Sequence, residues 1–92
     1  MAVTVRIPTP LRKLTGEKDI VTIDAGSVSD SIEQLEQSFP GMRARLCDET
    51  GELRRFVNIY VNGEDVRFLK GLDTPIKDRD EVSIVPAVAG GV

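Results

Sequence analysis

Residues 56–63, Phe-Val-Asn-Ile-Tyr-Val-Asn-Gly, carry the strongest strand signal in this sequence. Most residues from Phe56 to Val61 are β-branched or aromatic, which favours an extended strand. Asn62-Gly63 follows directly, and this pair is the preferred two-residue turn of a β-hairpin. The stretch therefore predicts a strand over residues 56–61, a tight turn, and a short return strand over residues 64–68.

Upstream of this hairpin, the sequence predicts a second one near the N-terminus. Apolar and polar residues alternate over residues 3–7, which is the period of a half-buried strand. Prolines at positions 8 and 10 end that strand, and Gly16 marks a turn. Residues 18–24 then form a second strand with Val21 and Ile23 buried, so we expect the two strands to pair antiparallel.

One long helix is predicted between the two hairpins. Ser27 is a suitable N-cap, and Asp30 adds a carboxylate to the first turn. Pro40-Gly41 ends the helix, and residues 42–47 suggest one further short helical turn. Within the helix, the apolar residues recur at the spacing of one helical face: Val28, Ile32, Leu35 and Phe39.

Downstream, a connector over residues 69–76 and a polar turn over residues 77–80 lead to a last strand over residues 81–85. The element order is β-β-α-β-β-β, which predicts an α+β roll with one helix-covered sheet face. If the first and last strands pair in the middle of the sheet, they lie parallel and the sheet is mixed. That arrangement is the β-grasp, or ubiquitin-like, fold.

The length of 92 residues allows one small domain, which we assign to residues 1–86. Residues 87–92, Ala-Val-Ala-Gly-Gly-Val, contain nothing that can pack a core. We therefore expect them to form a flexible C-terminal tail.

The composition excludes several classes of function. The chain has no histidine and one cysteine, so it cannot build a Ser-His-Asp triad, a Cys-His pair or a usual zinc site. Its formal charge of −3 argues against a general nucleic-acid binder. No apolar run is long enough to span a membrane, and no signal peptide is recognisable. These observations predict a cytoplasmic protein with no nucleic-acid or membrane partner and no bound cofactor or metal.

Three groups of side chains are candidates for chemistry, and each has a simpler structural explanation. Cys47 would be a nucleophile only with a base beside it, and is better explained as a small apolar residue. The acidic run at positions 78, 80 and 81 is interleaved with basic residues and suits a solvated turn. Arg54-Arg55 is either a contact for an acidic partner or a charged flank beside a hydrophobic strand.

A Gly-Gly pair alone is a weak functional signal, but Gly90-Gly91 at the end of a β-β-α-β-β-β fold is a much more specific one. Residues 57–68, Val-Asn-Ile-Tyr-Val-Asn-Gly-Glu-Asp-Val-Arg-Phe, and 85–91, Val-Pro-Ala-Val-Ala-Gly-Gly, are the most specific segments. With them, the whole chain resembles the ubiquitin-like sulfur carriers (MoaD/ThiS type). Within that family it is most similar to the CysO-type carriers, which donate sulfide for cysteine synthesis.

This resemblance implies a carrier that is not itself an enzyme. An E1-like enzyme would use ATP to adenylate the carboxylate of Gly91, and sulfide would then displace AMP to leave a thiocarboxylate. A sulfur-accepting synthase, such as a cysteine synthase, would receive the sulfur. Gly90 and Gly91 lack Cβ atoms, so the end of the tail can enter a narrow channel.

We expect partner enzymes to contact one sheet face and the tail. Strand alternation places Phe56 and Tyr60 on the face without the helix, and Val85 should join them. Val92 lies beyond the terminal Gly-Gly of the family, so we expect a peptidase to remove it before activation. The alternative is a permissive enzyme that tolerates it. The expected partner contacts are Phe56, Tyr60, Val85, Ala87, Val88 and Ala89.

Two other functions and several pathways remain open at this point. In the first alternative, the activated carboxylate forms an isopeptide bond with lysine, as in a ubiquitin-like protein modifier. In the second, the domain is a plain interaction module. For a sulfur carrier, the product could be cysteine, thiamine, the molybdenum cofactor or thiolated tRNA.

Overall fold

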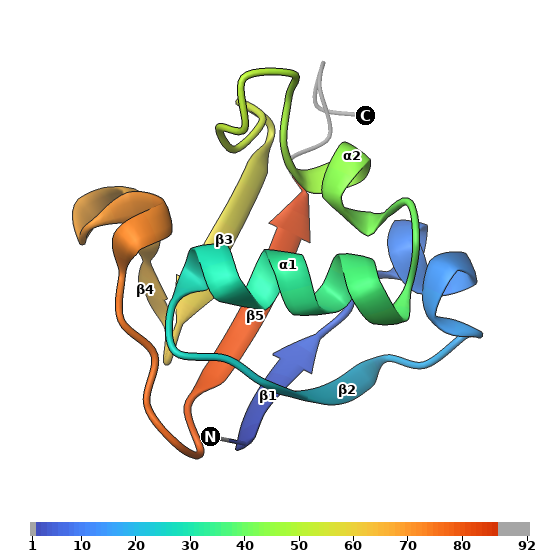
Figure 1. Cartoon of the computed structure of the whole chain (residues 1–92), viewed down its shortest axis with the longest axis horizontal. Helices are drawn as coiled ribbons and strands as arrows, with labels where there is room; N and C mark the ends of the chain where they lie inside the picture. Colours follow the sequence, from blue (N-terminus) through green and yellow to red (C-terminus); the bar gives the residue numbers. More distant parts are fainter. Residues whose placement is uncertain (1, 87–92) are drawn as a thin grey trace.

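Five strands form one mixed sheet in the order β2-β1-β5-β3-β4 in a computed structural model that describes residues 2–86 (Figure 1). The last strand pairs parallel with the first and antiparallel with β3, so it lies at the centre of the sheet. This is the predicted β-grasp topology. The strands are β1 (Ala2–Arg6), β2 (Ile20–Asp24), β3 (Val57–Val61), β4 (Glu64–Asp65) and β5 (Glu81–Pro86).

Helices cover one face of this sheet. The long helix α1 (Val28–Ser38) crosses the strands, and the short helix α2 (Met42–Leu46) lies near the C-terminal end of β5 (Figure 1). Three 3₁₀ helices complete the fold: η1 (Thr9–Thr15), η2 (Val66–Phe68) and η3 (Gly71–Asp73). Within residues 2–86, no helix has the length and apolar character required to cross a bilayer.

The core lies between α1 and the helix-covered face of the sheet. Alternate residues of β1, β3 and β5 are buried there, as the period of two predicts. The helix contributes the face that the sequence indicated, although Phe39 is only partly buried. The central members of this core are Val3, Val5, Val28, Ile32, Leu35, Val57, Ile59, Val82 and Ile84.

The helix boundaries follow from local hydrogen bonds. The side chain of Ser27 accepts a hydrogen bond from the backbone N–H of Asp30 at 3.0 Å. The carboxylate of Asp30 in turn accepts one from the backbone of Gly26. These two bonds satisfy donors that the helix itself cannot pair, which confirms the predicted N-cap.

The structure corrects several predicted boundaries. Residues 64–68 do not form one strand, because β4 has only two residues and the chain then turns into η2. The carboxylate of Asp65 accepts a hydrogen bond from the backbone of Arg67 and caps that turn, while Val66 becomes fully buried. The strand predicted from residue 18 begins at Ile20, and the segment after Pro8 is the helix η1.

Candidate functional site

The C-terminal end of β5 is the last described part of the chain before the Gly-Gly segment in the sequence. Pro86 is the last described residue, and it pairs with Val57 of β3. Gly90 and Gly91, together with Ala87, Val88, Ala89 and Val92, lie outside the described residues. The structure therefore gives the position of Pro86, from which residues 87–92 continue.

The sheet face opposite the helices presents a mixed surface beside this exit. Asn58 of β3 lies directly across from Val85 of β5, and Tyr60 lies across from Ser83. Val85 is 44% exposed, whereas Tyr60 is half-buried. The prediction that Tyr60 and Val85 share the open face agrees with this register, because paired residues point to the same side of a sheet.

Arg67 of η2 connects the open face to the segment before β3. Its guanidinium donates one hydrogen bond to the side-chain oxygen of Asn58 and another to the carbonyl of Arg54 at 2.9 Å. Asn58 lies on β3, and Arg54 lies in the segment just before it. The two hydrogen bonds from Arg67 therefore hold η2 against the N-terminal end of β3. No feature of the sequence indicated the contact, since it joins residues that are separated by a turn and two strands.

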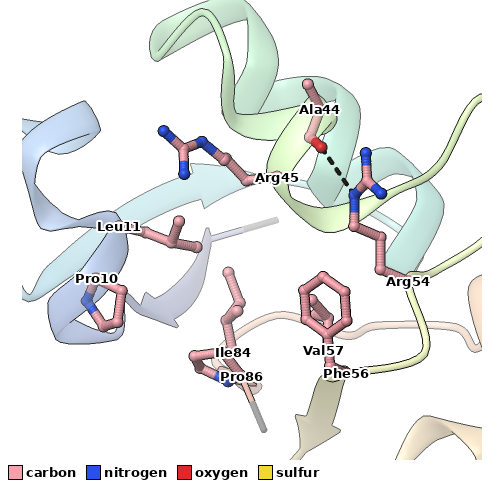
Figure 2. A pocket seen from close by; sticks show the side chains of 9 residues that line it. All are labelled: Pro10, Leu11, Ala44, Arg45, Arg54, Phe56, Val57, Ile84 and Pro86. Carbon is pink, nitrogen blue, oxygen red and sulfur yellow. Dashed lines mark hydrogen bonds between the residues drawn. The ribbon is translucent and has the colours of Figure 1, made fainter. Parts of the chain in front are cut away.

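Phe56 does not share the open face with Tyr60, contrary to the expectation from strand alternation. It precedes β3 in a turn, so the alternation of the strand does not extend to it. Its ring instead lines a hollow together with Ala44 and Arg45 of α2, on the helical side of the sheet (Figure 2). Its exposure of 48% leaves it accessible there.

That hollow has a volume of about 310 Å³ and opens beside the end of β5. Residues from η1, α2, the turn before β3, and both β3 and β5 contribute to it. Phe56 and Arg54 among them were singled out in the sequence as possible partner contacts, and the other lining residues come together through tertiary structure. The lining residues are Pro10, Leu11, Ala44, Arg45, Arg54, Phe56, Val57, Ile84 and Pro86.

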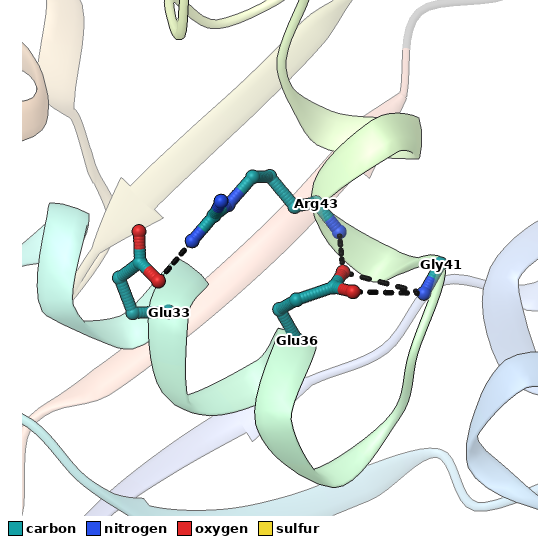
Figure 3. A network of polar contacts seen from close by, with 4 residues as sticks. All are labelled: Glu33, Glu36, Gly41 and Arg43. Carbon is teal, nitrogen blue, oxygen red and sulfur yellow. Dashed lines mark hydrogen bonds and ion pairs between the residues drawn. The ribbon is translucent and has the colours of Figure 1, made fainter.

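The position of α2, and hence of this hollow, is fixed by side chains of α1 (Figure 3). The carboxylate of Glu36 accepts hydrogen bonds from the backbone N–H groups of Gly41 and Arg43. These bonds hold the pKa of Glu36 below its usual range. The guanidinium of Arg43 also forms an ion pair with Glu33, which gives a second link between the two helices.

Two of the three side-chain candidates, Cys47 and the acidic run, have structural roles. Cys47 is only 5% exposed, and burial raises the pKa of its thiol, so the thiolate needed for nucleophilic attack is disfavoured. Asp80 accepts hydrogen bonds from Lys77 and Asn62, and Asp78 accepts one from the backbone of Ala2. These bonds confirm a turn around Asp78 and Asp80, whereas Glu81 is the first residue of β5 and forms an ion pair with Arg6.

Arg54 and Arg55 occupy different environments. Arg54 donates to the carbonyl of Ala44 at 3.0 Å, and its own carbonyl accepts from Arg67. Arg55 is exposed and lies with Phe56 beside a second hollow. The pair therefore combines a structural contact with an accessible charge.

Comparison with known proteins identifies the family. The profile of the ThiS family matches residues 5–91. The chain belongs to the ThiS family. The sulfur carrier protein CysO of Mycobacterium tuberculosis is 52% identical to this ThiS-family chain, over 99% of the chain and the full length of that relative.

Solved structures agree with this assignment. A chain of the BexX/CysO complex of Amycolatopsis orientalis superposes with a TM-score of 0.92 at 49% identity, covering 98% of this chain and 100% of that chain. The resemblance to ubiquitin-like sulfur carriers and the β-grasp fold are thereby confirmed. Several of the relatives are named as sulfur carrier proteins, and this ThiS-family chain is accordingly a sulfur carrier and not an enzyme.

A relative with a different name is also similar over the full chain. The small archaeal modifier protein 3 of Haloferax volcanii is 36% identical over 99% of this chain and 100% of its own length. The relatives of this ThiS-family chain thus include a protein named as a modifier.

Proposed function

We propose that this chain carries sulfur as a thiocarboxylate on Gly91 and delivers it to an enzyme of cysteine biosynthesis. The observation that carries the proposal is the full-length similarity to proteins named CysO, in a family match that includes Gly91. The geometry supports it, because the strand that leads toward Gly91 is the central strand of the sheet.

The chemistry requires two steps at the Gly91 carbonyl. First, the carboxylate attacks the α-phosphorus of ATP on an E1-like enzyme, which forms an acyl-adenylate and releases pyrophosphate. Sulfide then attacks the acyl carbon, the carbon–oxygen bond to AMP breaks, and the thiocarboxylate remains. The enzyme binds the ATP, so the carrier needs no cofactor and no catalytic side chain of its own.

The tail residues suit this reaction. Neither Gly90 nor Gly91 carries a Cβ, so a narrow active-site channel can close around them. Ala87, Val88 and Ala89 have small apolar side chains, which can make limited contact with the walls of the same enzyme channel. Tyr60 and Val85 on the open face provide a surface beside the exit that both the activating enzyme and the sulfur acceptor can contact.

Val92 must be removed before this chemistry can begin. With Val92 attached, the Gly91 carbonyl is part of a peptide bond, and an amide is not adenylated. We therefore include a peptidase that cleaves after Gly91 among the partners. The cytoplasm is the compartment that supplies ATP and keeps the lone Cys47 reduced, and we place the carrier there.

The experiment compares residues 1–91 with residues 1–92. Each is incubated with candidate E1-like enzymes, ATP and sulfide, and its intact mass is measured. The shorter form should gain the mass of one oxygen-to-sulfur exchange, and the longer form should stay unchanged. If the shorter form gains no mass with any of these enzymes, the proposal is wrong. Equal modification of the two forms would show that Val92 is tolerated.

Protein modification is the second candidate, favoured by the similarity to a protein named as an archaeal modifier. In that case, a lysine amine attacks the same adenylate and forms an isopeptide bond with Gly91. Replacing sulfide by a lysine-rich acceptor protein in the reaction tests it. A covalent adduct that contains the carrier and the acceptor would support modification.

A further inference from the structure

The hollow at the end of β5 combines an apolar interior with a basic rim (Figure 2). Leu11, Val57 and Ile84 are buried core residues whose side chains also reach it. Arg45 and Arg54 are its charged members. No carboxylate is present among the nine described residues that line it, although the chain as a whole has a net charge of −3.

Phe56 separates this hollow from a second one. The neighbouring hollow is lined by Asp48, Arg54, Arg55 and Phe56, so Phe56 and Arg54 belong to both. The carboxylate of Asp48 already accepts hydrogen bonds from Thr50 and from the backbone of Glu52. An exposed aromatic ring between two hollows, with arginines beside it, has the composition of an interface anchor.

The location of the hollow relates it to the chemistry at Gly91. Pro86 lines it, and Gly91 follows five residues later, so a fully extended chain separates them by at most about 18 Å. Part of that length is needed for Gly91 to enter an active-site cleft. The body of an enzyme that acts on Gly91 therefore has to approach this end of the domain closely.

We propose that this hollow is the docking site for an acidic loop of the adenylating enzyme, in which carboxylates flank one apolar anchor side chain. The anchor enters beside Phe56, and the carboxylates face Arg45 and Arg54. The inference rests on the proposed function, since it assumes that such an enzyme acts on Gly91. It assigns a contact surface on the helical side of the sheet, in addition to the open face.

Two matched pairs of variants test the docking site. Phe56→Ala removes the ring, and Phe68→Ala is its control because Phe68 is 87% exposed on η2, away from the hollow. Arg45→Glu reverses a rim charge, and Lys70→Glu reverses an exposed charge elsewhere. All four are made in residues 1–91, and circular dichroism melting establishes that each one folds.

The measurement is steady-state formation of the sulfur-loaded carrier with the adenylating enzyme, ATP and sulfide. Phe56→Ala and Arg45→Glu should each raise the KM for the carrier about tenfold or more, a typical loss for a truncated anchor. The kcat should stay near the original, because the substitutions change the docking surface and leave the reacting carboxylate of Gly91 unaltered. Raising the salt concentration should reduce the effect of Arg45→Glu.

The outcomes separate this inference from the proposed function. If residues 1–91 are not loaded by any adenylating enzyme, the proposed function fails and the docking site fails with it. If they are loaded, but both hollow variants keep the original KM or lose no more than their controls, only the docking site is overturned. Should Phe56→Ala fail to fold, the comparison of Arg45→Glu with Lys70→Glu decides.

Discussion

Val57 of β3 is paired with Pro86 of β5, the last described residue before the Gly-Gly segment. Val57 is buried, and β3 pairs with β5 as far as Pro86, whereas the pairing of β1 with β5 ends at Ser83, so the backbone at this end of β5 is held from the β3 side. The tail therefore starts from a defined position next to both proposed contact surfaces. For an enzyme that binds the domain at this end, the distance from Pro86 to Gly91 is limited by the length of five residues.

Val85→Asp should weaken loading of the carrier, and Ile20→Asp should not. Both residues lie on the open face and are similarly exposed, at 44% and 42%, but Ile20 is on the edge strand β2, farther from the tail exit. A carboxylate at position 85 would face a desolvated enzyme surface, and we expect the KM to rise about tenfold. Equal effects of the two variants would rule out a specific role for Val85.

Gly63→Ala should destabilise the domain by about 1 kcal/mol or more, because its φ of +87° lies in the left-handed region. Asn62 has a φ of +51°, so both turn residues have the positive φ of the predicted turn. Gly26→Ala is the control, since that residue has no positive φ and a Cβ there meets open space. Urea denaturation of both variants measures the difference, and identical midpoints would contradict the turn assignment.

Cys47→Ala should load sulfur at the original rate and change the alkaline stability. Burial raises the pKa of the Cys47 thiol, so the folded state favours the protonated form. That contribution is complete below the pKa of the unfolded chain and is lost as pH rises toward the folded pKa. The stability of the original chain should therefore fall more steeply than that of the variant as the pH rises above about 8.5, the ordinary pKa of a cysteine thiol. Loss of loading in the folded variant would assign Cys47 a chemical role.

Asp80→Asn should remove an acid-sensitive contribution to stability. Hydrogen bonds from the backbone of Lys77 and the side chain of Asn62 lower the pKa of Asp80. Its contribution is present above the unfolded pKa and is lost as pH falls through the folded pKa. The stability difference between the two proteins should be larger at neutral pH than at about pH 3. A difference independent of pH would show that the charge of Asp80 does not matter.

The sequence predicted the elements whose signals are local. Alternation in β1 and β3, the Ser27 cap and the Asn62-Gly63 turn each depend on neighbouring residues, and all are present. The parallel direction of β1 and β5 was predicted on the condition that these two strands pair with each other, and the structure shows that they do.

The parts that were missed depend on tertiary contacts. Strand alternation failed at Phe56 because β3 begins one residue later. The return strand stopped early because Asp65 caps a 3₁₀ turn that buries Val66. The hollow joins Leu11, Arg45 and Pro86, which are far apart in sequence, so no linear pattern could indicate it.

The most direct test of the central claim is to locate the transferred sulfur. Residues 1–91 are loaded with the E1-like enzyme, ATP and sulfide, and the product is fragmented in a mass spectrometer. Fragments that contain Gly91 should have one sulfur in place of one oxygen, and fragments that contain Cys47 should be unchanged. Sulfur added at Cys47 with an unmodified Gly91 would contradict the account.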